Sequence, residues 1–184
     1  MNAKDALRAD ARDILRAISS EDYVRRSRLI EAQLIQQLAT LDNQFPLAVI
    51  GSFLSLRGEP RFEKERWSSL PWKLAYPSPE GEGMVYRLPH GPLPQKGHWL
   101  TAGEVRVPEV IVVPGLVFSS QGYRIGRGGG FYDRLLSDWK PAIASIGVCF
   151  DEQIRDGWEP EAHDRKLDLI ITDTRVISCG IRER

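Results

Sequence analysis

Arginines and glycines are concentrated between residues 124 and 130, where the sequence reads RIGRGGG. Glycines ahead of a helix let the backbone approach a ligand closely, and the N–H groups of the first helical turn favour an anion. Arg124 and Arg127 add forked donors that suit phosphate oxygens. The stretch therefore favours a polyphosphate-binding loop over the alternative, a structural turn with two solvated arginines.

Neither of the two common nucleotide motifs explains this loop. No GxxxxGK[ST] sequence occurs, and a GxGxxG match that starts at Gly126 fails at Phe131. The chain also has no GxSxG or HExxH sequence, and no order of Ser, His and Asp that indicates a catalytic triad. A nucleotide site in this chain must therefore be of another type.

Two aspartates are candidates for holding a magnesium ion beside phosphate. Mg²⁺ prefers one or two carboxylates together with phosphate oxygens. Asp133 lies three residues after Gly130, and Asp164 lies in a polar turn ahead of the apolar stretch 167–173. From spacing alone, a first-turn aspartate that complements the helix dipole is the stronger explanation for Asp133. His163 is better explained as an exposed turn residue than as a general base.

The elements that must position these residues alternate along the chain. Apolar residues at helical spacing predict helices over 3–18, 20–39, 62–70 and, after the glycines, 128–139. Short apolar runs predict strands over 47–56, 73–77, 84–89, 110–115, 142–150, 167–173 and 175–179. Residues 90–104 have no periodicity and are predicted to form a loop. The predicted buried face of the 20–39 helix comprises Val24, Leu29, Ile30, Leu34 and Leu38.

This alternation predicts an α/β fold, a single-domain layered sandwich over residues 1–184 with a mostly parallel sheet flanked by helices. Ligands of such sheets bind beyond the carboxyl ends of the strands. The glycine loop follows the 110–115 strand, so we expect it at that edge of the sheet. Asp164, which precedes the 167–173 strand, could approach the same edge by its position.

Charge and composition narrow the class of protein. The 184 residues carry 25 Lys and Arg against 25 Asp and Glu, and a net charge of zero argues against a nucleic-acid partner. The apolar runs are far shorter than a membrane span, and the N-terminus has no segment of signal-peptide type, so we expect a cytoplasmic protein without a membrane partner. Cys149 and Cys179 lie in apolar strand-like stretches and are expected to be buried, reduced thiols.

Three segments resemble one known family. The stretches VPGLVF (113–118), GYRIGRGGGFYD (122–133) and HDRKLDLIITD (163–173), in that order, resemble 5-formyltetrahydrofolate cyclo-ligases, also called methenyltetrahydrofolate synthetases. The similarity is dense over 108–173 and thinner over KDALR (4–8) and FLSLRGE (53–59). It implies one α/β domain that uses ATP and Mg²⁺ to convert 5-formyltetrahydrofolate to 5,10-methenyltetrahydrofolate, with release of ADP and phosphate.

The resemblance also implies roles for individual residues. The ATP-binding positions are Lys4, Arg8, Arg124, Gly126, Arg127, Gly128, Gly129, Gly130, Phe131 and Tyr132. The folate-binding positions are Leu54, Glu59 and Phe131, the catalytic ones are Arg127, Tyr132 and Asp133, and the magnesium ligands are Asp133 and Asp164. A carboxylate such as Glu59 can accept hydrogen bonds from the amino group and ring N–H of a pterin.

The sequence departs from the family pattern on the folate side. Phe62 stands where Thr is common, and residues 60–104 match poorly. Two alternatives therefore stay open: a paralogue that uses the same ATP site on another formyl or amide substrate, and a folate- or nucleotide-binding protein without turnover. We expect a monomer whose partner is a small-molecule substrate.

Overall fold

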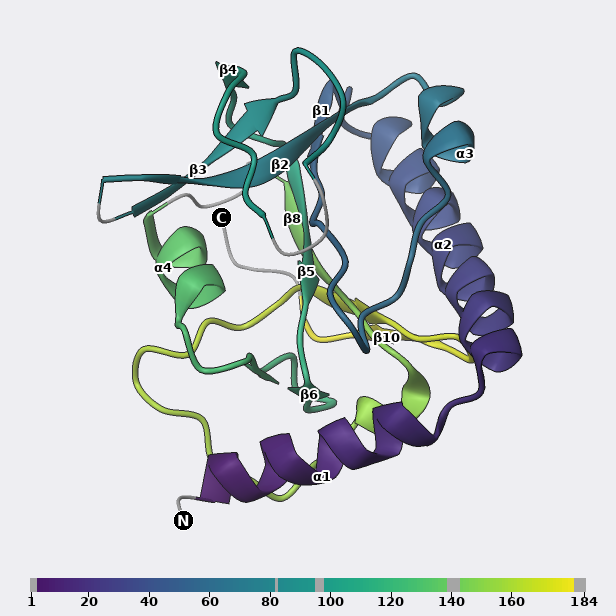
Figure 1. The fold of residues 1–184 in the computed structure, drawn as a ribbon, viewed down its shortest axis with the longest axis vertical. Helices are drawn as coiled ribbons and strands as arrows, with labels where there is room; N and C mark the ends of the chain where they lie inside the picture. Colours follow the sequence, from purple (N-terminus) through teal and green to yellow (C-terminus); the bar gives the residue numbers. More distant parts are fainter. Residues whose placement is uncertain (1–2, 82, 95–97, 139–142, 181–184) are drawn as a thin grey trace.

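Helices and strands are interspersed along the chain, although six strands follow one another between the third and fourth helices (Figure 1). The computed structural model describes residues 3–81, 83–94, 98–138 and 143–180, and every structural statement below concerns those residues. The helices are α1 (Ala3–Ala17), α2 (Ser20–Asp42), α3 (Lys64–Ser68), α4 (Phe131–Asp138) and the 3-10 turn η1 (Asp151–Gln153). The strands are β1 (Val49–Gly51), β2 (Lys73–Glu80), β3 (Gly83–Leu88), β4 (Glu104–Val105), β5 (Val110–Pro114), β6 (Val117–Phe118), β7 (Arg124–Ile125), β8 (Ala144–Val148), β9 (Leu169–Ile171) and β10 (Val176–Ser178).

One eight-stranded sheet forms the centre, with the strand order β10-β9-β8-β5-β1-β2-β3-β4. The five strands from β9 to β2 run parallel to their neighbours. Strands β10, β3 and β4 pair antiparallel at the two edges. The predicted α/β fold with a mostly parallel sheet flanked by helices is confirmed.

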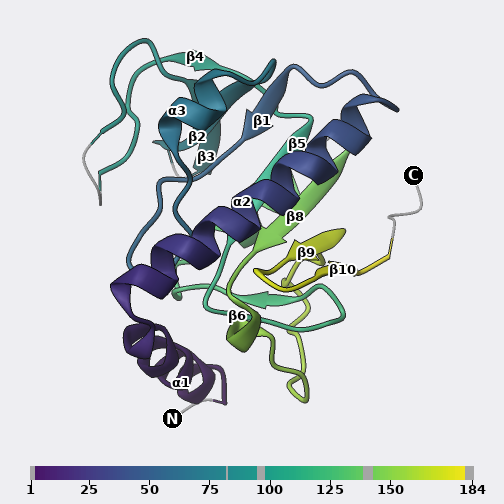
Figure 2. The ribbon, with the colours of Figure 1, turned by 90° about the vertical axis from the view of Figure 1, so that its right-hand side faces the viewer.

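The central strands β1, β5 and β8 are buried on both faces, because they carry apolar or small residues at successive positions. Along β5, Val110 and Val112 face one core together with α2, whereas Ile111 and Val113 face a second core together with α4. This alternation follows from the two-residue repeat of a strand. Figure 2 shows α2 crossing the face of β5 and β8, and α1 lies below, next to β6.

Helix α2 buries a more polar face than the sequence predicts. Ile30 is fully buried as expected, but Val24 and Leu29 are exposed, and this part of the prediction is wrong. Ser27 and Glu31 occupy the buried face instead. Glu31 is tolerated there because its carboxylate accepts hydrogen bonds from the Trp67 indole and the Glu63 backbone, as a buried polar group requires.

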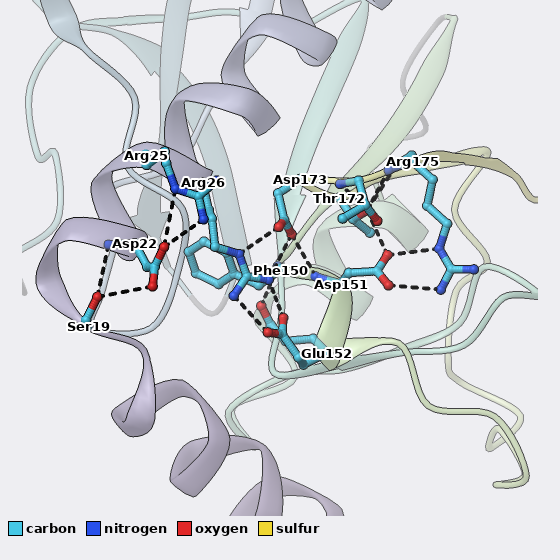
Figure 3. Close-up of polar contacts among 12 residues, drawn as sticks. Ser19, Asp22, Arg25, Arg26, Phe150, Asp151, Glu152, Thr172, Asp173 and Arg175 are labelled. Carbon is cyan, nitrogen blue, oxygen red and sulfur yellow. Dashed lines mark hydrogen bonds and ion pairs between the residues drawn. The ribbon is translucent and has the colours of Figure 1, made fainter.

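A charged network joins α2 to the carboxyl ends of β8 and β9 (Figure 3). Arg26 donates from Nε to Asp173 Oδ2 at 2.6 Å and also pairs with Glu152. Its guanidinium lies 5.1 Å from the ring centroid of Phe150. Asp173 accepts a further hydrogen bond from the Asp151 backbone at 2.9 Å. This network fixes the amino-terminal part of α2 against the sheet.

Several element boundaries differ from prediction for local reasons. Only Val49–Gly51 of the predicted 47–56 strand pairs in the sheet, because Phe53 and Leu54 leave the sheet and line cavities. The short β6–β7 hairpin was not predicted.

Cys149 and Cys179 are buried free thiols, as expected. Among the described helices, none combines the length and apolarity needed to cross a bilayer.

Candidate functional site

A cavity of about 450 Å³ lies where β1 and β5 end, a volume typical of small-molecule sites. Four stretches distant in sequence form most of its wall: the start of α1, the loop after β1, the glycine loop and the turn at 161–164. All the residues that the sequence singles out line this one cavity: Lys4, Arg8, Leu54, Glu59, Arg124, Gly126, Arg127, Gly128, Gly129, Gly130, Phe131, Tyr132, Asp133 and Asp164. The fold therefore brings the candidate residues together.

The glycine loop connects the β6–β7 hairpin to α4 through backbone conformations that favour glycine. Gly128 and Gly130 have φ angles of 109° and 62°, which L side chains rarely adopt. These turns let the loop run along the cavity wall before α4 begins at Phe131. Three consecutive glycines are thus explained by two left-handed positions and a wall that a ligand can approach closely.

Arg124 is a cation held almost entirely out of water. It is 3% exposed, and its Nη2 donates to Asp133 Oδ1 at 3.2 Å. Its guanidinium lies 5.2 Å from the ring centroid of Tyr132, a cation–π arrangement. Its Nε is buried and has no hydrogen-bond partner among the described residues. Burial lowers the pKa of Arg124 from its ordinary value, and nearby Asp133 opposes the shift.

Helix α1 supplies two cations from one face to the same cavity. Lys4 and Arg8 are four residues apart and so lie one above the other on the helix. The Lys4 ammonium pairs with Asp164 Oδ2 at 2.7 Å, and Arg8 Nε donates to the Gly126 carbonyl at 3.0 Å. Figure 1 shows the start of α1 beside the segment that carries Asp164. Helix α1 therefore joins the glycine loop to the 161–164 turn.

Asp164 is ionised and held by two donors. Its side chain is 6% exposed, and it accepts from the Lys4 ammonium and from the Glu161 backbone, each at 2.7 Å. Burial alone would raise the pKa of Asp164, but these hydrogen bonds outweigh burial and hold the pKa below its ordinary value. His163 is exposed, as expected, and its ring lies 3.3 Å from Glu161.

On the opposite wall, Glu59 pairs with an arginine of the glycine loop. Glu59 is 5% exposed and accepts from Arg127 Nε at 3.0 Å and from the Leu56 backbone at 2.8 Å. Arg127 also donates to the Arg57 carbonyl at 2.6 Å. The loop after β1 and the glycine loop are thereby tied together across the cavity.

Sequence reasoning predicted Phe131 but missed its aromatic neighbour at the rim, Trp99. Trp99 lies in the predicted loop 90–104, where no periodicity draws attention to it. Its ring centroid is 5.6 Å from that of Phe131, and both side chains are exposed. His98 lines the cavity beside it. The sequence offered only one indication that this loop reaches the cavity, namely the presence of a tryptophan and a histidine in an aperiodic stretch.

The donor set of the cavity fits a metal that shares its ligands with phosphate. No group of three or more His, Cys, Asp or Glu side chains in the described ranges is placed to hold a metal ion by itself. Asp133 and Asp164 both line the cavity. One or two carboxylates suffice for Mg²⁺ when phosphate oxygens and water complete the coordination.

Comparison with known proteins identifies the family. Residues 60–173 match the 5-formyltetrahydrofolate cyclo-ligase family. The chain belongs to this family. The match begins at residue 60, so the stretch 60–104, which resembles the family poorly by its motifs, lies inside it.

Relatives of this cyclo-ligase family member match it over different lengths. A 5-formyltetrahydrofolate cyclo-ligase of Mycolicibacterium smegmatis is 37% identical over 79 residues, which are 43% of this chain and 41% of that protein. The chain thus spans about two fifths of that relative. The enzyme of the same name from Mus musculus is 28% identical and matches over 92% of this chain and 93% of its own.

Solved structures of the family share the fold. An NMR structure of 5,10-methenyltetrahydrofolate synthetase from Aquifex aeolicus superposes with a TM-score of 0.80 at 26% identity, covering 100% of this chain and 96% of the other. A synthetase from Mycoplasma pneumoniae gives 0.77 at 21% identity, covering 94% and 99%.

The departure at Phe62 falls outside the wall of the main cavity. Phe62 lines a second cavity of about 360 Å³ and packs with ring centroids 5.4 Å from Phe53 and 5.6 Å from Trp67. Phe53 lines both cavities. In this family member Phe62 therefore contacts the main cavity only indirectly, through Phe53, which lines it.

Proposed function

We propose that the protein converts 5-formyltetrahydrofolate to 5,10-methenyltetrahydrofolate, with ATP becoming ADP and phosphate. The observation that carries this proposal is that one cavity contains both the arginine–glycine loop and the buried carboxylate Glu59. Family membership supports the reaction, because the relatives matched by this chain are named for it.

The phosphates of ATP are proposed to bind between α1 and the glycine loop. Lys4, Arg8, Arg124 and Arg127 bring four cationic side chains to the cavity. Gly126, Gly128, Gly129 and Gly130 let the loop backbone approach, and Phe131 and Tyr132 continue it. Arg124 contributes a buried guanidinium to this wall, and its Nε has no hydrogen-bond partner in the part of the chain that the structure describes. Charged donors of this kind suit phosphate oxygens.

The folate is proposed to bind on the side of Glu59 and Leu54. Glu59 is ionisable, buried and within the cavity, so it can accept hydrogen bonds from the amino group and ring N–H of a pterin. Phe131 and Trp99 offer aromatic faces at the rim for a second ring. With this division, the formyl group would lie between the two binding regions.

In the proposed chemistry, phosphorylation turns the formyl oxygen, a poor leaving group, into phosphate, a good one. The formyl oxygen attacks the γ-phosphorus of ATP and ADP leaves; N10 then attacks the formyl carbon, phosphate leaves, and the N10 proton is lost. Arg127 neutralises charge on the transferring group. Burial raises the pKa of Tyr132, so its phenol stays protonated and holds the Arg124 guanidinium by its ring face.

Asp133 and Asp164 are the residues we propose to hold magnesium. The ion would neutralise charge on the phosphate oxygens. Both aspartates now pair with cations, Asp133 with Arg124 and Asp164 with Lys4. The same carboxylates also orient these two cations when no metal is bound.

We further propose that residues 1–184 act as one domain and as a monomer in the cytoplasm. One sheet organises both cores, and residues of a single chain line the cavity. Zero net charge supports a small-molecule substrate over a nucleic-acid partner.

The test is the near-ultraviolet absorbance of the methenyl product, followed with purified protein, 5-formyltetrahydrofolate, ATP and Mg²⁺. We expect a rise that needs both ATP and Mg²⁺. A flat trace with ATP binding intact by calorimetry would instead favour a paralogue with another formyl or amide substrate. Binding of folate and ATP without any turnover would identify a binding protein.

A further inference from the structure

Three cations of the cavity each pair with a carboxylate that the proposed reaction also needs. The pairs are Lys4–Asp164 at 2.7 Å, Arg124–Asp133 at 3.2 Å and Arg127–Glu59 at 3.0 Å. The first two pairs join groups that serve the same ligand, ATP with its metal. The third pair is different, because Arg127 is assigned to ATP and Glu59 to the folate.

The Arg127–Glu59 pair lies in the wall of the cavity and joins the two proposed binding regions. The Glu59 side chain is 6% exposed and that of Arg127 is 36% exposed. Arg127 is the charged group that hydrogen-bonds to Glu59 in the described structure, and the Leu56 backbone supplies the second hydrogen bond. Arg127 is therefore the cation that neutralises the buried charge of Glu59, and its own side chain is partly exposed.

If one ligand separated this pair, it would change the affinity for the other. A buried carboxylate that loses its cation is strongly destabilised until another donor replaces it. ATP that draws Arg127 toward its phosphates would leave Glu59 ready for the N–H donors of a pterin. A pterin that takes Glu59 would leave Arg127 ready for phosphate.

We propose that the Arg127–Glu59 ion pair couples the two substrate sites, so that each substrate tightens the binding of the other. The inference rests on the proposed function and adds a regulatory property to its site. Coupling is reciprocal by thermodynamic necessity, and coupling factors in proteins are roughly 5- to 150-fold. The folate dissociation constant should therefore fall by such a factor when a nucleotide is bound.

The experiment is isothermal calorimetry on the full chain with 5-formyltetrahydrofolate and a non-hydrolysable ATP analogue plus MgCl₂, each alone and in the presence of the other. We expect equal coupling factors of roughly fivefold or more in both orders. A factor of one with both ligands bound overturns the coupling alone. Absence of folate binding overturns the proposed function as well.

Two substitutions test the coupling, because each should tighten the binding of one ligand, whereas loss of a merely structural ion pair would not. Glu59→Gln releases Arg127 and should tighten nucleotide binding in the absence of folate, with a coupling factor near one. Arg127→Gln should conversely tighten folate binding in the absence of nucleotide. Glu63→Gln is the matched control: it breaks an exposed pair with Arg28 and should leave both affinities and the coupling unchanged. Weaker nucleotide binding by Glu59→Gln together with weaker folate binding by Arg127→Gln would overturn the inference.

Discussion

Replacing Lys4 by Met tests whether the pair with Asp164 holds the cavity together. The substitution removes the charge and keeps an unbranched apolar side chain. The two side chains are 11% and 6% exposed and the Nζ–Oδ2 distance is 2.7 Å. Removing one member of a buried pair costs about 3–5 kcal/mol. Because Asp164 keeps its hydrogen bond from the Glu161 backbone, we expect the lower end, about 3 kcal/mol near neutral pH.

This cost should depend on pH with a definite sign. The pKa of Asp164 is lowered in the folded protein, since hydrogen bonds from Lys4 and the Glu161 backbone outweigh burial. A group with a lowered folded-state pKa stabilises the fold above its unfolded-state pKa, about 3.9, and loses that contribution as the pH falls through the folded-state value. The difference between Lys4→Met and the native protein should therefore shrink below about pH 4.

Urea unfolding of both proteins near pH 7 and below about pH 4 measures this difference. Arg16→Met is the matched control in α1, because its pair with Asp13 is 61% and 74% exposed. We expect a change below about 0.5 kcal/mol for the control. An equal deficit of Lys4→Met at both pH values would refute the ion pair as its source, and no deficit at neutral pH would refute the anchoring role of Lys4.

Three further substitutions test the site and its support. Arg127→Ala should raise the ATP dissociation constant roughly 10- to 150-fold, because a charged hydrogen bond contributes about 1.5–3 kcal/mol; unchanged affinity by calorimetry would remove Arg127 from the nucleotide site. Asp133→Asn should abolish turnover in the absorbance assay while folate affinity stays largely intact, and normal turnover would exclude the magnesium role. Arg26→Met should lower the free energy of unfolding by about 3 kcal/mol, because Asp173 stays buried without its cation; a loss below about 0.5 kcal/mol would show that the network behaves as an exposed pair.

The sequence predicts best where one short stretch determines the outcome. The strand 110–115 is apolar at nearly every position, and β5 forms there with both faces buried. The consecutive glycines of the glycine loop predict an irregular backbone by themselves, so the position of the loop between a strand and α4 could be predicted. Most of the site residues lie in this one local stretch, and the fold brings the others to the same cavity from distant stretches: Lys4, Arg8, Leu54, Glu59 and Asp164.

Prediction fails where distant parts of the chain supply the environment. Glu31 is buried on α2 because Trp67 provides a donor from another element, which helical spacing cannot reveal. Val24 and Leu29 lie on the solvent-exposed side of α2, although their residue types favour burial. Trp99 reaches the cavity through its contact with Phe131, a neighbour 32 positions along the chain.

The ion pair between Lys4 and Asp164, which lie at opposite ends of the set of cavity residues in sequence, has a consequence for protein synthesis. Lys4 and Asp164 are separated by 160 residues. At synthesis rates of about 5–20 residues per second, roughly 8 to 32 s pass between the addition of these two residues. A nascent chain therefore cannot form the Lys4–Asp164 pair until Asp164 has left the ribosome, so the helix that folds first waits for a turn made much later before this side of the cavity is complete.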